Sequence, residues 1–234
     1  PKRYLVTGRA VGPEGAPIEN VVITAGDVYT AFTNSDGAFG FGLSPGEQTL
    51  TPIQRSFAWD PPQRPVTVPP AANGQDFVGY RILQKTAQPD VQRPVAYGDT
   101  LTYTLHLRGP DFAGAILADP VPTYTLFLSE TLQSLPGIVY HTESNTLSGT
   151  LPLAVMESGV ITYSVRVAVT GTVESGPVIV NQARIYPADA PEQAIWSEPV
   201  IHYTYLWPTY LPLFPLQEQT CLLYTSDAAD ERSS

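Results

Sequence analysis

The sequence has a single cysteine, Cys221, so it has no pair of cysteines that could form an internal disulfide. Charged residues are also scarce, at 15% of the 234 residues, against about 25% in an average globular domain. Lysine and arginine together number 12 against 22 acidic residues, which gives a net charge of −10. The basic residues are scattered, which excludes the clustered positive surface that nucleic-acid binding requires. No run of about 18 apolar residues occurs, so no membrane-spanning helix is expected in this sequence.

The side chains that usually carry catalysis are equally sparse. The three histidines, His106, His141 and His202, form no H-E-x-x-H motif and no pair four residues apart, so no zinc site is predicted. No G-x-S-x-G motif marks a serine nucleophile. The sequence therefore predicts no catalytic residue, no metal site and no cofactor, and indicates that the chain is not an enzyme. Pairs of acidic residues that meet only in the folded chain remain an open alternative.

The residues that are abundant favour β-structure. The sequence has 24 prolines and 18 glycines, and they separate short segments rich in threonine, valine and tyrosine. This pattern is typical of many short strands joined by turns. With 43% hydrophobic residues, the chain can fill packed cores. We predict an all-β fold with two tandem β-sandwich domains, at residues 3–80 and 96–203, joined by a linker at 81–95.

The stretch TNSDGAFGFGL at residues 33–43 is the clearest local signal in the first unit. Residues 34–37 indicate a turn, because Gly37 accepts the positive φ that such a turn needs. Phe39 and Phe41 then alternate with glycines, which places both rings on one face of a strand. The glycine spacing excludes a dinucleotide-binding loop, and a calcium loop would need more oxygen ligands. A structural hairpin is favoured, with a weak metal site involving Asp36 as the alternative.

Three stretches of the first unit carry a family resemblance: VTGRAVGPEGAPIENVVITAG, TNSDGAFGFGLSPGEQTLTP and VTVPPAANGQDFVGY. They resemble a carboxypeptidase regulatory-like domain, close to the B-type repeats of collagen adhesins. The resemblance implies a small transthyretin-like (Cna-B-like) β-sandwich that serves as a spacer or rigid module. Some members of that group carry a Lys–Asn isopeptide bond. The only lysines here, Lys2 and Lys85, both lie outside the strands that we expect, so no such bond is expected.

The second unit has two long strands with unbroken alternation. In TLTYTLHL, Leu101, Tyr103, Leu105 and Leu107 share one face, and His106 lies on the opposite, solvated face. The stretch VITYSVRVAV alternates in the same way. Its inward positions are Ile161, Tyr163, Val165, Val167 and Val169.

The stretches VAYGDTLTYTLHLRG, AILADPVP, GVITYSVRVAVTG and VNQARIY are similar to the conserved repeat domain of bacterial envelope proteins. The matching positions are Gly98, Asp99, Tyr103, Asp119, Pro122, Asn181 and Ala183. The turn after the first long strand departs from the family pattern, because it reads Arg108-Gly109-Pro110 instead of Asn-x-Gly. The resemblance implies an immunoglobulin-like sandwich without known chemistry, often found in tandem on surface proteins. We interpret Asp36, Asp99 and Asp119 as turn residues that bond their own backbone.

The end of the sequence has two unusual parts. Residues 204–220 are rich in proline and aromatic residues, which prevents a helix and predicts an extended segment. Within it, TYLPLFP looks like the Y-L-P-L sequences near the C-termini of extracellular proteins from filamentous green bacteria, so envelope anchoring is the alternative to a plain linker. Residues 221–234 contain CLLYTSDAADE, which resembles translated sequencing adapter and is excluded from the fold. Because the chain starts at Pro1, we expect it to be part of a longer protein.

Together these features predict a non-catalytic structural, spacer or adhesion fragment of a larger secreted or cell-surface bacterial protein. Its expected partners are other domains of the same polypeptide and an envelope or extracellular ligand, with no nucleic acid and no membrane span in this fragment. The alternative is an accessory ligand- or glycan-binding region of a secreted hydrolase, in which Trp59, Trp196 and Trp207 stack on sugar rings instead of packing internally. An enzyme in its own right is the third reading.

Overall fold

The computed structural model describes residues 2–204 except 91–93, 111, 113 and 169–177. The described chain consists of strands and one short 3₁₀ helix, η1 (Pro191–Gln193), with no α-helix. The predicted all-β fold is therefore confirmed. Val169, Trp207, the extended segment beyond residue 204 and the adapter-like tail at 221–234 lie outside the described residues.

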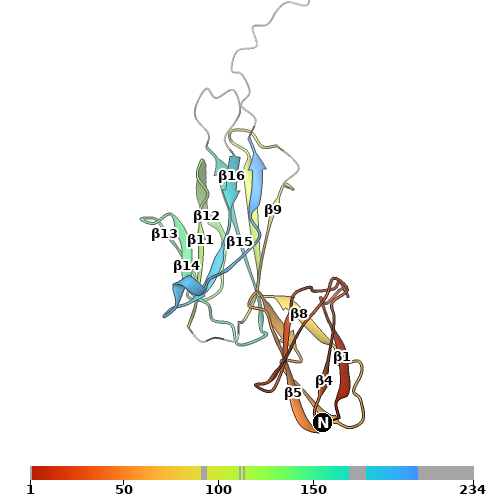
Figure 1. Ribbon diagram of the computed structural model, residues 1–234. Coiled ribbons are helices and arrows are strands. Elements are labelled where there is room, and N and C mark those ends of the chain that lie inside the picture. The colour runs from red at the N-terminus through yellow and green to blue at the C-terminus, as the bar shows by residue number, and fades with distance from the viewer. Residues whose placement is uncertain (1, 91–93, 111, 113, 169–177, 205–234) are drawn as a thin grey trace, which may run out of the picture.

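The first domain is a sandwich of two four-stranded sheets (Figure 1). One sheet has the order β4-β1-β8-β6 and the other the order β3-β2-β5-β7. The strands are β1 (Tyr4–Val11), β2 (Val22–Ala25), β3 (Tyr29–Phe32), β4 (Ala38–Leu43), β5 (Gly46–Ile53), β6 (Phe57–Asp60), β7 (Arg64–Val68) and β8 (Phe77–Arg81).

The turn at residues 34–37 has the predicted structural role. The side-chain oxygen of Asn34 accepts hydrogen bonds from the backbone N–H groups of Asp36 and Ala38. Gly37 has φ +72°, and a Cβ there would lie 2.4 Å from the carbonyl oxygen of Ala10. The following strand β4 then buries Phe39, while Phe41 packs half-buried against the same core. The turn thus fixes how β4 enters the sandwich.

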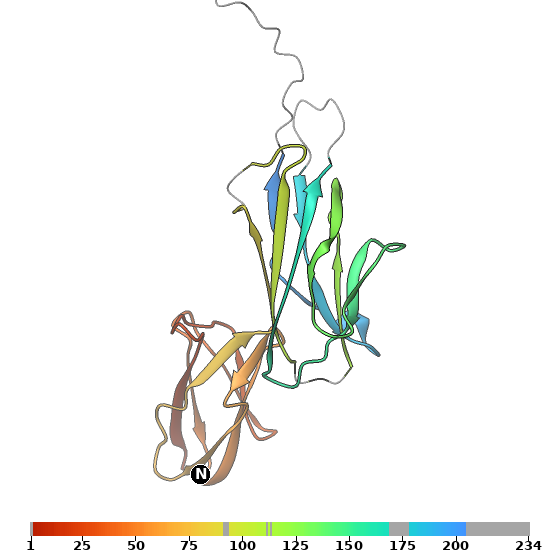
Figure 2. The same ribbon diagram turned by 180° about the vertical axis from the view of Figure 1, so that it is seen from behind.

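The second domain contains a four-stranded sheet, β12-β15-β10-β9, facing a five-stranded sheet, β13-β14-β11-β17-β18, and a ribbon, β16-β19 (Figure 2). The strands are β9 (Leu83–Gln88), β10 (Thr100–Arg108), β11 (Ala115–Pro120), β12 (Thr125–Gln133), β13 (Val139–His141), β14 (Thr146–Thr150), β15 (Ser158–Val167), β16 (Val178–Asn181), β17 (Arg184–Pro187), β18 (Ile195–Trp196) and β19 (Val200–Tyr203).

Strands β10 and β15 form the centre of the second domain. They pair antiparallel over their whole length, and Tyr103 lies directly opposite Tyr163. The side chains at the predicted inward positions of β10 are all buried, and so are those of β15 up to Val167. His106 points to solvent, as the alternation predicts. The alternation of the sequence therefore places these two strands in the core correctly.

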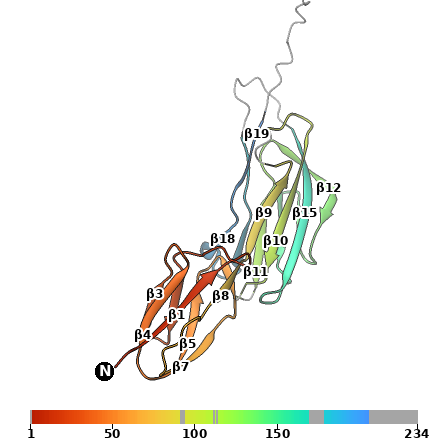
Figure 3. The ribbon, with the colours of Figure 1, turned by 90° about the vertical axis from the view of Figure 1, so that its right-hand side faces the viewer.

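One residue, Ile82, separates β8 of the first domain from β9 of the second. Ile82 and Ala58 pack with the core of the second domain, and the backbone N–H of Arg108 donates to the carbonyl of Ile82. Part of the stretch that we expected to be a linker is thus strand β9. The domains lie end to end at an angle, with the N-terminus and the end of β19 at opposite ends of the molecule (Figures 1 and 3).

Candidate reactive cluster in the second core

Four polar side chains from four strands meet inside the second domain. They are Lys85 on β9, Asp119 on β11, Tyr163 on β15 and Asn181 on β16. The side chains of Lys85 and Asp119 are both 0% exposed, and the residues Tyr163 and Asn181 are 0% and 1% exposed. A lysine and an aspartate are rarely buried to this extent, so the cluster needs a physical explanation.

The strand period explains why these side chains point inward. Lys85 lies between the inward residues Leu83 and Ala87, and in the sheet it is opposite Leu105. Asn181 follows the inward residue Ile179 at the same spacing of two. Each polar residue of the cluster therefore occupies a position where the pattern of its strand places an apolar side chain.

The Tyr163 hydroxyl is the centre of the cluster. It donates a hydrogen bond to Asp119 Oδ2 at 2.8 Å. It accepts one from Asn181 Nδ2 at 2.8 Å and one from Lys85 Nζ at 3.1 Å. A phenol has one donor and two acceptor positions, so this hydroxyl is fully used. Lys85 Nζ also forms an ion pair and hydrogen bond with Asp119 Oδ2.

Two oxygens of the cluster have no hydrogen-bond partner within the described chain. They are Asp119 Oδ1 and Asn181 Oδ1, and both are buried. The carboxylate oxygen of Asp119 and the amide oxygen of Asn181 are both hydrogen-bond acceptors. Burying an acceptor without a donor is unfavourable. The buried cluster therefore contains two acceptor oxygens that no donor of the described chain satisfies.

Aromatic rings surround the lysine. Lys85 Nζ lies 4.8 Å from the centroid of the Tyr103 ring and 5.2 Å from that of Tyr163. Burial lowers the pKa of Lys85, although the charge and hydrogen bond of Asp119 act in the opposite direction. Burial, together with the negative charge of Asp119, raises the pKa of Tyr163 well above its ordinary value. The amine is thus shifted toward its neutral, nucleophilic form, while the phenol stays protonated.

This arrangement has the components of a transamidation. An amine without its proton is a nucleophile, a carboxamide carbon is its electrophile, and a carboxylic acid can polarise the amide oxygen. Lys85 Nζ and Asn181 Nδ2 both contact the same hydroxyl, so the amine and the carboxamide are within one hydrogen-bonding shell. Such close placement replaces a bimolecular encounter by an intramolecular one.

Two sequence-based expectations were wrong here. We expected Lys85 to lie outside the strands, but it lies within β9 and is buried. We expected Asp119 to be a turn residue, but it lies within β11 and pairs with Lys85. Asp99 does act as a turn residue, because its Oδ2 accepts from the backbone N–H of Ala96. Asp119 differs because its strand continues through Pro120.

The remaining candidate residues do not gather into a second site. His202 is buried, with Nε2 3.0 Å from the carbonyl oxygen of Pro89, while His141 is exposed. Trp59 packs in the first core, and Trp196 is half exposed beside Arg184. Among the described residues, no group of three or more histidine, cysteine, aspartate or glutamate side chains could hold a metal ion. In the same part of the chain, no helix is long and apolar enough to cross a bilayer.

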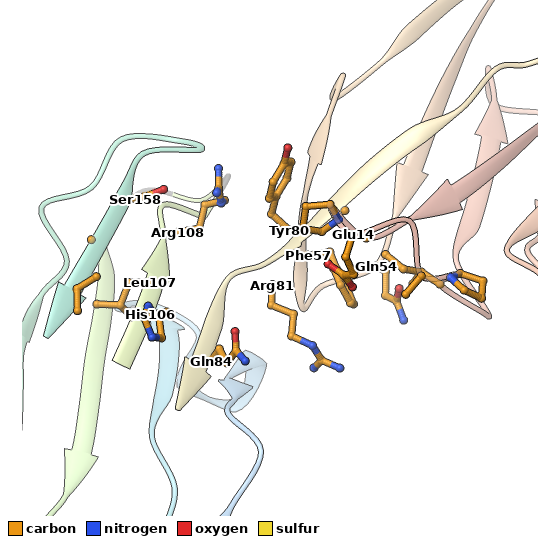
Figure 4. A pocket seen from close by; sticks show the side chains of 18 of the residues that line it. Glu14, Gln54, Phe57, Tyr80, Arg81, Gln84, His106, Leu107, Arg108 and Ser158 are labelled. Carbon is orange, nitrogen blue, oxygen red and sulfur yellow. The ribbon is translucent and has the colours of Figure 1, made fainter. Parts of the chain in front are cut away.

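A cavity of about 800 Å³ lies at the junction of the two domains (Figure 4). Glu14, Gln54 and Phe57 line it from the first domain, and His106 and Arg108 line it from the second. The Arg108 guanidinium lies 4.0 Å from the centroid of the Tyr80 ring, which connects the two domains across this cavity. Its lining is mixed in charge and shows no cluster of the kind seen in the second core.

No family model matches this sequence, and no curated protein matches it. Solved structures do show similarity. The major pilin subunit BcpA of Bacillus cereus has a TM-score of 0.46 at 13% identity, over 87% of this chain and 69% of that one. The full-length major pilin SpaD of Corynebacterium diphtheriae has a TM-score of 0.49 at 14% identity, over 86% of this chain and 66% of that one.

A third similarity is to the collagen-binding domain of a Staphylococcus aureus adhesin. It has a TM-score of 0.34 at 13% identity, over 54% of this chain and 99% of that domain. The structural neighbours are thus pilins and adhesin domains of bacterial surface proteins. At such identities the similarity concerns the fold alone.

Proposed function

We propose that this chain is a spacer segment of a secreted or cell-surface bacterial protein, and that its second domain locks itself with an amide bond between Lys85 and Asn181. The observation that carries the proposal is the buried cluster of amine, acid and carboxamide. Its parts come from three strands that are distant in the sequence, and each is turned into the core. An acid–amine pair that served stability alone would be a poor choice, since well-packed apolar residues are often at least as stabilising.

The reaction balances without any added reagent. A proton passes from the Lys85 ammonium to Asp119 Oδ2 across their hydrogen bond. The neutral amine attacks Asn181 Cγ, while protonated Asp119 stabilises the charge that develops on Asn181 Oδ1. The Nζ–Cγ bond forms, the Cγ–Nδ2 bond breaks, and Nδ2 departs as ammonia. At the end of the reaction, Lys85 and Asn181 are joined by an amide, and Asp119 is a neutral carboxylic acid.

The position of the bond suits a load-bearing role. Strand β9 enters the second domain at the joint, and β16 pairs with β19, the last described strand. An amide between β9 and β16 would connect the entry strand covalently to the strand that pairs with β19, so a pull along the molecule would bypass strands β10 to β15. It would also close a loop of roughly 100 residues, worth about 4–5 kcal/mol in the chain-entropy treatment of cross-links.

Intact mass spectrometry of the purified chain tests this proposal. The wild type should be lighter than its sequence mass by one ammonia, about 17 Da. The Lys85→Arg, Asp119→Ala and Asn181→Ala variants should have their full sequence masses. Asn73→Ala, which removes an exposed asparagine of the first domain, should retain the mass loss. A folded wild type at full sequence mass would contradict the amide bond and leave an ordinary buried ion pair.

A further inference from the structure

The amide-forming reaction has a proton-transfer problem that the three reacting residues do not solve. After the attack, the new bond leaves an extra proton on Lys85 Nζ, while Asn181 Nδ2 needs a proton to depart as ammonia. Both nitrogens are then bonded to the same carbon, so a direct transfer would pass through a strained four-membered ring. A group that contacts both nitrogens and can both accept and donate a proton avoids this strain.

The Tyr163 hydroxyl is positioned to be this group. Its oxygen lies 3.1 Å from Lys85 Nζ and 2.8 Å from Asn181 Nδ2. Both distances are within the range for proton transfer through hydrogen bonds. Through one hydroxyl, the path from nitrogen to nitrogen is a six-membered ring, which has little strain. Tyr163 is 0% exposed, so water has no ready access to take its place.

We propose that the Tyr163 hydroxyl is a catalytic residue of this reaction, which carries a proton from the attacking nitrogen to the departing one. The proposal rests on the proposed amide bond. Before the attack, the hydroxyl proton is directed at Asp119 Oδ2. When Asp119 takes the proton of Lys85, that oxygen becomes a poor acceptor. The hydroxyl is then free to turn its proton to the lone pair that Asn181 Nδ2 gains as its carbon becomes tetrahedral.

The relay leaves the tyrosine unchanged. Oη receives one proton from Nζ and gives its own proton to Nδ2, so it ends as a neutral phenol. Burial raises the pKa of Tyr163, which is consistent with a group that never holds a charge. The titratable and polar groups that face it are Asp119, Lys85 and Asn181, with the Tyr103 ring 5.5 Å away between centroids.

Tyr103 provides a matched control. It lies directly opposite Tyr163 in the sheet and is also 0% exposed. Its ring also lies over Lys85 Nζ. Its hydroxyl, however, makes no hydrogen bond to Lys85 Nζ, and burial raises its pKa, although the neighbouring Asn181 side chain lowers that pKa by a smaller amount. Tyr103→Phe therefore changes the same residue type in the same environment without removing the hydroxyl that contacts both nitrogens.

The test follows the mass loss in freshly synthesised full-length chain. Protein made in a short cell-free pulse is incubated at fixed pH, quenched in denaturant and measured by intact mass. Tyr163→Phe should form the amide about a hundredfold or more slowly than the wild type, while Tyr103→Phe should react at the wild-type rate. A folded Tyr163→Phe that reacts as fast as the wild type would overturn the relay, while ammonia loss in the wild type would still support the amide.

A second measurement needs no variant, in case Tyr163→Phe does not fold. The rate of the wild-type reaction is measured in mixtures of light and heavy water. A relay moves more than one proton in the same step, so the rate should fall along a curve as deuterium increases. A straight line would mean a single moving proton and would overturn the relay. Absence of any mass loss in the wild type would instead reject the amide bond itself.

Discussion

The core of the first domain is filled by apolar side chains, whereas the core of the second surrounds a lysine, an aspartate and an asparagine. In the first domain, the buried polar side chain Thr33 is satisfied by its backbone neighbours, accepting from Val21 N–H and donating to the carbonyl of Ile18. In the second, the buried ion pair leaves acceptors without donors. The amide bond would remove both charges and connect two strands. If the amide forms, the buried ion pair is only the state before the reaction, and its unfavourable desolvation disappears when the bond forms.

The largest expected effect comes from removing the bond. Asn181→Ala should lower the free energy of unfolding of the second domain by about 4–5 kcal/mol, because the unfolded chain regains the freedom of a loop of roughly 100 residues. Denaturant unfolding of the intact chain, followed separately for each domain by hydrogen exchange, measures this. The first domain should unfold as in the wild type. Equal stability of Asn181→Ala and the wild type would contradict a cross-linked second domain.

The second prediction concerns a substitution in the apolar core of the first domain. Phe77 is fully buried in the first domain and packs 6.3 Å from Phe39 between ring centroids. Phe77→Ala should destabilise the first domain by about 3–5 kcal/mol through the cavity that it leaves. The loss of ammonia should continue, because the cluster lies wholly in the second domain. An intact-mass measurement that shows no ammonia loss in this variant would mean that the second core depends on the first to react.

The third prediction concerns how the stability of the second domain depends on pH when the amide bond cannot form. In Asn181→Ala, Lys85 remains a buried amine whose pKa is lowered by burial below its ordinary 10.5. At pH values between the lowered pKa of the folded chain and 10.5, Lys85 is protonated in the unfolded chain but not in the folded one. The free energy of unfolding should therefore rise with pH in this range. Above about pH 10 the trend should reverse, because the unfolded chain loses tyrosine protons that Tyr163 keeps when folded.

Urea unfolding of Asn181→Ala from pH 7 to 10, compared with Lys85→Met/Asn181→Ala, measures this slope. The double variant has no amine at this position and should lack the rise. The cross-linked wild type should also lack it, since an amide does not titrate. A rise of equal size in all three proteins would assign the slope to other groups and contradict the burial of a free amine.

The smallest effect concerns the contact between the domains. The guanidinium of Arg108 lies over the ring of Tyr80, and Arg108 also donates to the carbonyl of Met156 in its own domain. A double-mutant cycle with Arg108→Ala and Tyr80→Leu isolates the contact between the domains from the second bond. We expect a coupling energy of about 0.5–1 kcal/mol. A coupling of zero would mean that this pair adds nothing to the other contacts between the domains, which include the packing of Ile82 and Ala58.

The sequence predicted the strands that form the framework but not the cluster inside it. The alternation in β10 and β15 correctly placed the side chains from Leu101 to Leu107 and from Ile161 to Val167. The turn at residues 34–37 was also predicted, because its chemistry is local. The domain boundaries and the envelope-anchoring role stay predictions.

The cluster was missed because Lys85 falls in the stretch that we expected to be a linker, and because we interpreted Asp119 as a turn residue. Lys85 lies in phase with Leu83 and Ala87, and Asp119 lies in phase with Ala115 and Leu117. In each strand the period-two pattern continues through the polar residue. That continuity was the signal that could have revealed the site. The pattern within each strand could not predict that β9, β11, β15 and β16 bring these side chains together. Their arrangement depends on contacts between residues that are distant in the sequence.

The single residue between β8 and β9 has a consequence for the register of the whole second domain. Side chains along a strand alternate between faces, so one extra residue after Ile82 would either turn Lys85 to the outer face or rotate the domain by half a turn about the chain. With a single residue between β8 and β9, the joint has no loop that could accommodate an inserted residue. The direction in which the second domain leaves the first therefore depends on the backbone angles at Ile82 together with the side-chain contacts across the joint, such as Arg108 with Tyr80.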